Sequence, residues 1–185
     1  MKVMVKGARA AFPSVFKAFK GKGQEGDGKF GIKGLLAKDS PAIAVIEAAM
    51  LQVAEEKWPK KGKQMVEALR KTDKLCLHDG DSKPDWEGFE GNMFISASSN
   101  TKPSVFDQQR NEIEASSGVF YSGCYANLSI EIWAQDNDYG KRINAQLRGV
   151  QKVRDGDAFA GGSRPAGSDE FEDEIDAPEE EDLSA

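Results

Sequence analysis

Hydrophobic and polar positions alternate through residues 119–135, which makes this segment the clearest strand prediction in the chain. Five even-numbered positions are apolar: Cys124, Ala126, Leu128, Ile130 and Ile132. The odd-numbered positions combine polar groups with aromatic rings: Tyr121, Tyr125, Asn127, Ser129, Glu131, Trp133 and Gln135. Because successive side chains of a strand point to opposite faces, we expect one buried face and one outward face that carries rings.

The same alternation predicts two long hairpins. Residues 142–154 form the second arm of the hairpin that begins at residue 119, with the turn at 136–141 and a bulge predicted at Gly149. Near the N-terminus, residues 8–19 and 29–37 predict two strands joined by a loop rich in glycine and lysine. Pro13 predicts an edge or bulged position within the first of these strands.

Helical periodicity is confined to the region between the hairpins. Ser40 is a favourable N-cap, Pro41 suits the first helical position, and Pro59 ends the helix. A second helix is predicted over 62–71, and short strands over 74–77 and 93–98. The polar segments 78–92 and 99–117 are predicted loops. No strand–helix–strand repeat is present, so the order favours a mainly β fold with inserted helices, arranged as a small closed barrel.

The acidic residues are concentrated at the C-terminal end. Residues 165–185 contain no Lys or Arg but ten acidic side chains: Asp169, Glu170, Glu172, Asp173, Glu174, Asp176, Glu179, Glu180, Glu181 and Asp182. The whole chain has a net charge of −6, whereas residues 1–164 carry 25 basic and 21 acidic side chains, a net charge of +4. We therefore expect one folded domain over 1–164 and a disordered acidic tail over 165–185.

Other features argue against several classes of protein. No apolar run approaches the ~18 residues of a membrane span, and no signal peptide is expected. Cys76 and Cys124 are isolated, which fits a reduced, cytoplasmic setting and no zinc site. His78, Asp79 and Asp81 allow the alternative of a metal-dependent nuclease, but a solvated loop is the simpler interpretation. We predict no enzymatic activity, no metal and no cofactor, because no catalytic motif is present.

Cations and rings occur together on both hairpins, as binding of single-stranded nucleic acid requires. The predicted phosphate contacts are Lys17, Lys20, Lys22, Lys29, Lys33, Arg142, Arg148 and Lys152. The predicted stacking rings are Tyr121, Tyr125 and Trp133, with Phe19 as a further candidate. The alternative is that the helices cover the outward face, so that its rings form a second core layer.

The tail has its own candidate roles. It could simply keep the protein soluble, or it could compete with DNA for the basic surface and recruit partner proteins when displaced. The residues predicted to bind partners are Asp169, Glu170, Phe171, Glu172, Asp173, Glu174, Glu179, Glu180, Glu181 and Asp182. A rival interpretation is an acidic-tailed protein-interaction module that does not bind nucleic acid.

Residues 120–159 contain a YSG segment, a polar strand, a glycine turn and the run LRGVQKVRDGD. Together with FPSVF at 12–16, LHDGD at 77–81 and ISASSNTKPSVFD at 95–107, they resemble a family of bacteriophage single-stranded-DNA-binding proteins formerly classed as a domain of unknown function. The resemblance implies an OB-fold with a five-stranded barrel, and binding of single-stranded DNA without sequence preference. It also implies an acidic tail and a role in phage replication or recombination in the host cytoplasm.

Two points stay open at this stage. The sequence does not decide between a monomer, a homodimer and cooperative assembly on DNA. Many single-strand binders end in an aromatic residue that docks partner proteins, whereas this sequence ends Leu183-Ser184-Ala185. Recruitment of replication or recombination proteins is therefore expected to depend on the charge of the tail and on Phe171.

Overall fold

The computed structural model describes residues 1–159, so the predicted disorder of the acidic tail lies outside the described residues. The elements in chain order are β1 (Lys2–Phe19), β2 (Lys29–Ala37), α1 (Pro41–Lys57), α2 (Gly62–Lys71), β3 (Leu77–Asp79), β4 (Asn92–Ser99), β5 (Ser104–Phe106), β6 (Tyr125–Asn137) and β7 (Gly140–Arg154). Two short 3₁₀ turns cover Gly80–Ser82 and Ala115–Ser117.

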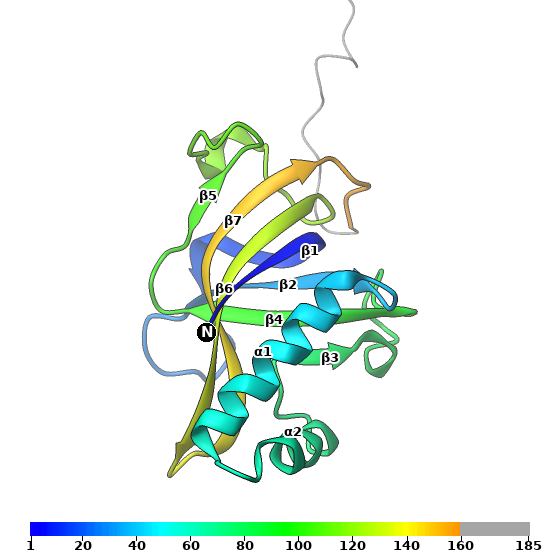
Figure 1. Ribbon diagram of the computed structural model, residues 1–185. Helices are drawn as coiled ribbons and strands as arrows, with labels where there is room; N and C mark the ends of the chain where they lie inside the picture. Colours follow the sequence, from blue (N-terminus) through cyan, green and yellow to red (C-terminus); the bar gives the residue numbers. More distant parts are fainter. Residues whose placement is uncertain (160–185) are drawn as a thin grey trace, which may run out of the picture.

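Five of the strands close into a barrel (Figure 1). β1 pairs antiparallel with both β2 and β6, β2 pairs with β4, and β6 pairs with β7. A parallel contact between Ser98 of β4 and Gln146 of β7 closes the ring. This connectivity is that of the OB-fold, and the predicted fold class is confirmed. The short strands β3 and β5 extend the sheet at β4 and β7.

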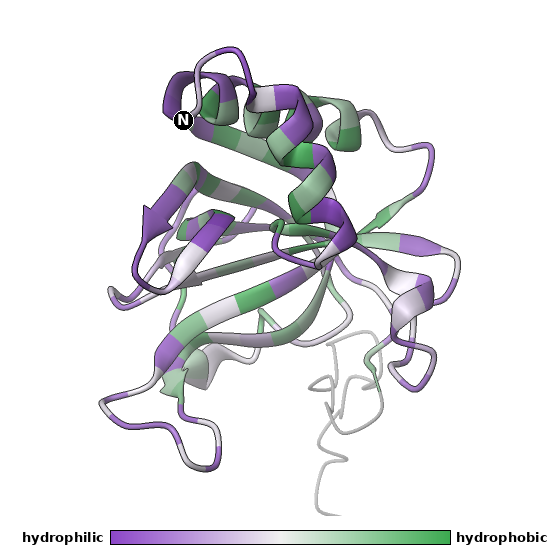
Figure 2. Cartoon of the chain, turned by 90° about the horizontal axis from the view of Figure 1, so that it is seen from below, coloured by the Kyte–Doolittle hydropathy of each residue, from purple (hydrophilic) through white to green (hydrophobic). Residues whose placement is uncertain are grey.

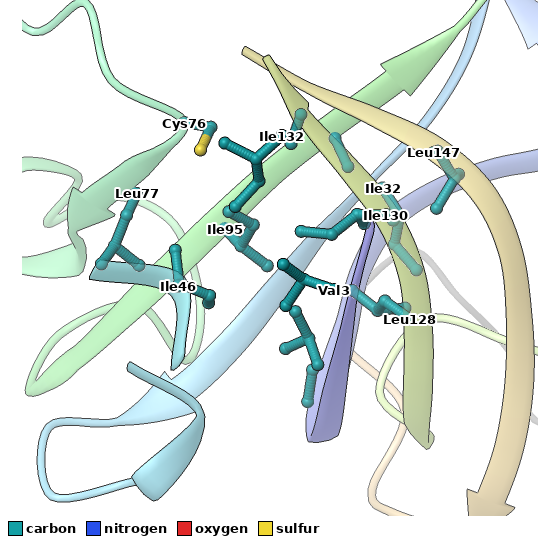
Figure 3. Packing of buried hydrophobic residues seen from close by; sticks show 14 of the residues in the cluster. Val3, Ile32, Ile46, Cys76, Leu77, Ile95, Leu128, Ile130, Ile132 and Leu147 are labelled. Carbon is teal, nitrogen blue, oxygen red and sulfur yellow. The ribbon is translucent and has the colours of Figure 1, made fainter. Parts of the chain in front are cut away.

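The barrel interior is filled by the apolar positions of the alternating strands. Ile130, Leu128 and Ile132 of β6 are completely buried, as the even-numbered pattern predicted. They meet Val3 of β1 and Leu147 of β7 within one cluster that also takes in α1 (Figure 3). Hydrophilic residues gather in the connecting loops (Figure 2). The period-2 pattern therefore determined which face of each hairpin became the core.

The two helices lie against one side of the barrel. Ser40 caps α1 by accepting a hydrogen bond from the backbone N–H of Ala42, and Pro41 is the first helical residue, as predicted. Trp58 follows the helix and donates its indole N–H to Asp136 at 2.8 Å, which ties α1 to the end of β6. Neither helix in the described part of the chain has the length and apolar character needed to cross a membrane.

The two predicted bulges are present. In β1 the pairing with β2 shifts between Ala11 and Ser14, and Phe12 takes a positive φ of 47°. Pro13 therefore marks the irregular position that its missing N–H suggested. In β7 the register shifts next to Gly149. Before this bulge the inward residues are odd-numbered, as at Leu147, whereas after it the even-numbered Val150 is buried.

Three strand predictions need correction. β1 begins at Lys2 rather than at residue 8, because Val3 and Val5 alternate inward and pair with β6. β3 covers Leu77–Asp79 rather than 74–77, although the carbonyl of Cys76 still accepts a bond from Ser96 N–H. β5 lies within a segment predicted to be a loop, since its three residues are too few to show a pattern.

Gly34 allows the barrel wall to pack closely, which gives a stability prediction. A Cβ at this position would lie 2.8 Å from Leu128 Cδ1 and 3.0 Å from both Ala8 Cβ and Ile95 Cγ2. Gly34→Ala should therefore lower the free energy of unfolding by about 1–3 kcal/mol through overpacking, measured by urea denaturation. Gly21→Ala is the matched control, because its added methyl would make only ordinary contacts with Gln24. Equal stability of the two variants would contradict the packing account.

Candidate functional site

The outer face of β2 and β4 carries the site, and its residues are arranged in rows across the sheet. Strand pairing places Arg9, Leu35, Phe94 and His78 in one row, because Leu35 pairs with Arg9 and Phe94, and Phe94 with His78. In the next row Lys33 pairs with Ala11 and Ser96. The third row contains Ser14, Gly31 and Ser98. In the first row Leu35 and Phe94 are buried. Lys33 and Ser96 of the second row, and all three residues of the third, border open space.

Two cavities lie over these open rows. One, of about 670 Å³, is lined mainly by apolar groups: Phe12, Pro13, Ser14, Phe19, Gln24, Lys29, Phe30, Gly31, Ile32, Lys33, Trp86, Ser96, Ala97 and Ser98. The other, of about 710 Å³, is lined mainly by polar groups: Lys29, Leu75, Cys76, His78, Ser96, Ser98, Ser99, Asn100, Thr101, Trp133, Gln135, Arg142, Asn144, Ala145 and Gln146. Lys29, Ser96 and Ser98 belong to both linings, so the two cavities are adjacent, and together we call them the outer-face groove.

An aromatic cluster forms one end of the outer-face groove. It consists of Phe12, Trp86, Phe89 and Phe94. The Trp86 ring lies edge-on to Phe12 and Phe89, with centroid distances of 5.1 Å to each. Phe89 is fully buried and also contacts Phe94 at 5.0 Å. Buried rings thus support Trp86 and Phe12 from behind, while Phe12 stays 56% exposed on the groove side.

Cations lie beside these rings. The Lys33 ammonium is 5.7 Å from the centroids of both Trp86 and Phe94 and donates a hydrogen bond to Ser96 Oγ at 3.2 Å. A second cation, the Lys83 ammonium, lies 5.0 Å from the centroid of the Trp86 ring. Burial, together with the charge of Lys83, lowers the pKa of Lys33 from its ordinary value. The groove therefore holds a partly desolvated positive charge beside its aromatic cluster.

The charge of the groove is one-sided. Among the described residues that line either cavity, none is Asp or Glu. Lys29, Lys33 and Arg142 are the cations of the lining, and none of the three is in an ion pair among the described residues. An anionic ligand in the groove would thus meet positive charge without competing carboxylates.

Five of the residues predicted from sequence line this groove: Phe19, Lys29, Lys33, Trp133 and Arg142. Trp133 is 43% exposed, so the helices do not cover its ring. The exposed residues Lys17, Lys20 and Lys22 lie at the end of β1 and in the loop that follows it. That loop joins β1 to β2 beside the groove residues Phe19 and Lys29.

Like Lys17, Lys20 and Lys22, the predicted residues Arg148, Lys152 and Tyr125 are absent from both linings. Arg148 forms an ion pair with Glu131 at 2.9 Å. Lys152 binds Asp155 at 2.6 Å and lies over the Tyr121 ring. Tyr125 is half-buried between cations, with the Arg154 guanidinium 3.7 Å from its ring centroid. The structure therefore divides the predicted set between the groove and a second region around the start of β6.

The placement of Tyr121 on an outward strand face is wrong. β6 begins only at Tyr125, and residues 119–124 form a turn in which Cys124 N–H binds the carbonyl of Tyr121. Tyr121 is 8% exposed, and its hydroxyl bonds with Asp155 and with the backbone of Gly156. Gly123 precedes the strand at a φ of 112°, and only glycine fits there because a Cβ would lie 2.2 Å from the carbonyl oxygen of Asp157. The Tyr121 ring is therefore part of the core.

Sequence reasoning missed Trp86 and Phe12, because Trp86 lies in a segment predicted only as a polar loop. A signal was present, since Trp86, Phe89 and Phe94 follow one another at short intervals in an otherwise polar and glycine-containing stretch. Phe12 precedes the bulge at Pro13 and takes a positive φ, and its side chain is 56% exposed.

The histidine–aspartate segment does not form the cluster that a metal site would need. His78 binds Asp73 at 2.6 Å and stacks on Phe94, whereas Asp79 and Asp81 both bind Lys38. No group of three potential metal ligands occurs among the described residues. Burial raises the pKa of the Cys76 thiol to about 12, so this buried thiol stays protonated at neutral pH.

Comparisons with known proteins agree with this geometry. A family model described as the single-stranded-DNA-binding protein of Enterobacter phage Enc34 matches residues 1–183. "Putative protein p50" of Acyrthosiphon pisum secondary endosymbiont phage 1 is 39% identical over 188 residues, which span 100% of both chains.

Solved structures give the same picture. The chain is similar to the single-stranded DNA-binding protein from bacteriophage Enc34 in complex with ssDNA, with a TM-score of 0.71 and 28% identity over 86% of this chain and 89% of that one. A C-terminal truncation of the Enc34 protein gives a TM-score of 0.69 and 31% identity over 85% and 88%. The single-stranded DNA binding protein gp2.5 of bacteriophage T7 shares the fold, with a TM-score of 0.61 and 13% identity over 94% and 98%.

Proposed function

The chain belongs to the Enc34 family of phage single-stranded-DNA-binding proteins, and we propose that it binds single-stranded DNA in the outer-face groove of β2 and β4. The observation that carries this proposal is a pair of adjacent cavities that share Lys29, Ser96 and Ser98 and are lined by aromatic rings and cations but, among the described residues, by no carboxylate. The sequence resemblance to this family is confirmed by the family match.

The cations of the groove neutralise the phosphates. Lys33 lines the apolar cavity, Arg142 lines the polar cavity, and Lys29 lines both. Lys17 at the end of β1, and Lys20 and Lys22 in the loop that follows, extend this charge. Burial removes part of the water around the Lys33 ammonium. A phosphate that enters the groove would accept hydrogen bonds from this ammonium in place of the lost water.

The rings of the groove bind the bases. Trp86, Phe12 and Phe19 line the apolar cavity and Trp133 lines the polar one, so bases can stack without hydrogen bonds that identify them. Every base has a flat face, which explains binding without sequence preference. Stacking requires unpaired bases, so the same rings favour single strands over duplex.

The acidic tail gives this site a competitor. Residues 165–185 carry ten negative charges and are tethered to the body that holds the groove, so their effective concentration at the cations is high. The tail competes with DNA and, once displaced, recruits proteins of phage replication or recombination through its acidic groups and Phe171. The proposed activity is binding rather than catalysis, and its proposed location is the host cytoplasm. Sedimentation with oligonucleotides of increasing length would measure whether the protein assembles on DNA.

A salt series tests both the groove and the tail. Full-length protein and residues 1–164 are titrated with fluorescent oligo-dT. Affinity should fall with salt at a slope of about −0.7 per neutralised phosphate. Removal of the tail should tighten binding most at low salt, because screening weakens a tethered polyanion. Equal affinity of the two proteins at low salt would remove the competitor role, and absence of binding by both would overturn the proposed function.

A further inference from the structure

Phe159 lies at the C-terminal end of the described chain but packs into the wall of the groove. Its ring is 7% exposed and belongs to the same buried cluster as Ala11, Leu35, Phe89 and Phe94, against which Trp86 packs. We propose that Phe159 is a positioning residue for DNA binding, which holds the Trp86 loop in the orientation that presents its ring to a base. This inference rests on the proposed function, since it assigns a support to the same groove.

The contact with the Trp86 loop is close. Gly88 lies two residues after Trp86 and has a φ of +82°. A Cβ on Gly88 would be 2.7 Å from Cε1 and 2.8 Å from Cζ of Phe159, so the ring lies directly against this backbone. The loop passes over the row of Leu35 and Phe94, and Phe159 fills the remaining space beneath Gly88. Removal of the ring would leave a cavity into which the loop can sink.

Several bonds fix the segment that carries Phe159. The Arg9 guanidinium lies 4.2 Å from the Phe159 ring centroid and donates to the carbonyl of Asp157 at 2.7 Å. The backbone N–H of Phe159 binds the carbonyl of Ser122 at 3.1 Å. Tyr121 bonds with the backbone of Gly156, which gives the buried tyrosine a structural role in the same arrangement. Residues 155–159 are thereby fastened to β1 and to the turn before β6.

The effect on DNA is indirect. Phe159 is almost fully buried and is absent from the linings of both cavities, so it is not expected to touch the ligand. It acts through Phe89 and Gly88 on Trp86. Loss of the Phe159 ring should therefore lower affinity by removing the Trp86 contribution, while the cations and their phosphate contacts remain in place.

A double-mutant cycle in the full-length protein tests this. We expect Phe159→Ala to weaken oligo-dT binding about 5- to 10-fold with an unchanged salt slope, as part of one stacking contact is lost. In a Trp86→Ala background the same substitution should add almost nothing, because the two residues act through one ring. Phe159→Leu serves if the alanine variant fails to fold.

Phe120→Ala is the matched control, because Phe120 is equally buried but packs against Phe16 in the main core. It should destabilise the protein without weakening DNA binding at temperatures where the variant is folded. The positioning role is overturned if Phe159→Ala binds DNA normally while Trp86→Ala binds weakly, or if the effects of the two substitutions add. Either result leaves the proposal that DNA binds in the groove intact. Normal binding by both Trp86→Ala and Lys33→Gln would instead overturn the proposed function.

Discussion

Trp86→Ala should weaken binding of oligo-dT by about 1–3 kcal/mol, roughly a 5- to 150-fold rise in Kd. The reason is that Trp86 lines the apolar end of the groove and is held by Phe12 and Phe89 at 5.1 Å, so its ring is ordered before DNA arrives. An ordered ring loses little side-chain entropy when a base stacks on it. The measurement is fluorescence anisotropy of labelled oligo-dT at fixed salt.

Two comparisons make this result specific. Trp86→Phe keeps an aromatic face and should recover most of the affinity. Trp133→Ala tests the other end of the groove and should lose affinity independently, because Trp133 lies in the second cavity. Unchanged affinity in folded Trp86→Ala protein would contradict stacking at this end.

Lys33→Gln should weaken binding about 10-fold or more at low salt, because a charge-assisted contact with phosphate is lost. The salt slope should decrease by about 0.7, the value of one phosphate contact on a single strand. Arg148→Gln is the matched control, because Arg148 is already paired with Glu131 and lines neither cavity. Equal losses in the two variants would show that general positive charge, rather than the groove, binds DNA.

The pH dependence follows from the lowered pKa of Lys33. Only the protonated lysine attracts phosphate, so the affinity for DNA should fall as pH rises through the pKa of Lys33. This fall should come at a lower pH than for an ordinary lysine, whose pKa is about 10.4. Phosphate favours the protonated form, so DNA binding should take up protons in this alkaline window. Lys33→Arg keeps its positive charge in this pH range, so the affinity of this variant for DNA should change little with pH. A wild-type profile identical to that of Lys33→Gln would contradict the role of the ammonium.

The hairpins and helices were predictable because the apolar residues of each element recur at the spacing of a strand or of a helix. β2 and α2 match the predicted ranges, and the even positions of β6 are buried as the alternation required. The pattern failed where glycine interrupts it. At Gly123 the strand stops, and Tyr121, which continues the odd-numbered series, turns into the core.

The groove was half predictable for a related reason. Alternation placed Trp133 and Arg142 on an outward strand face, whereas Phe19, Lys29 and Lys33 were predicted because cations and rings occur together on the hairpins. All five line the groove. Trp86 lies in an irregular loop, whose position over Leu35 and Phe94 depends on long-range packing. Phe159 is further removed, because its contacts with Arg9 and Gly88 join segments 150 and 71 residues away in the sequence. No local pattern encodes such contacts.

Photocrosslinking tests the central claim most directly. Oligo-dT carrying 5-iododeoxyuridine is bound to the full-length protein, irradiated and digested, and the crosslinked peptides are identified by mass spectrometry. The groove predicts crosslinks at Trp86, at Phe12 or Phe19, and at Trp133. Crosslinks confined to the region of Tyr125 and Lys152, with none in the groove, would contradict it.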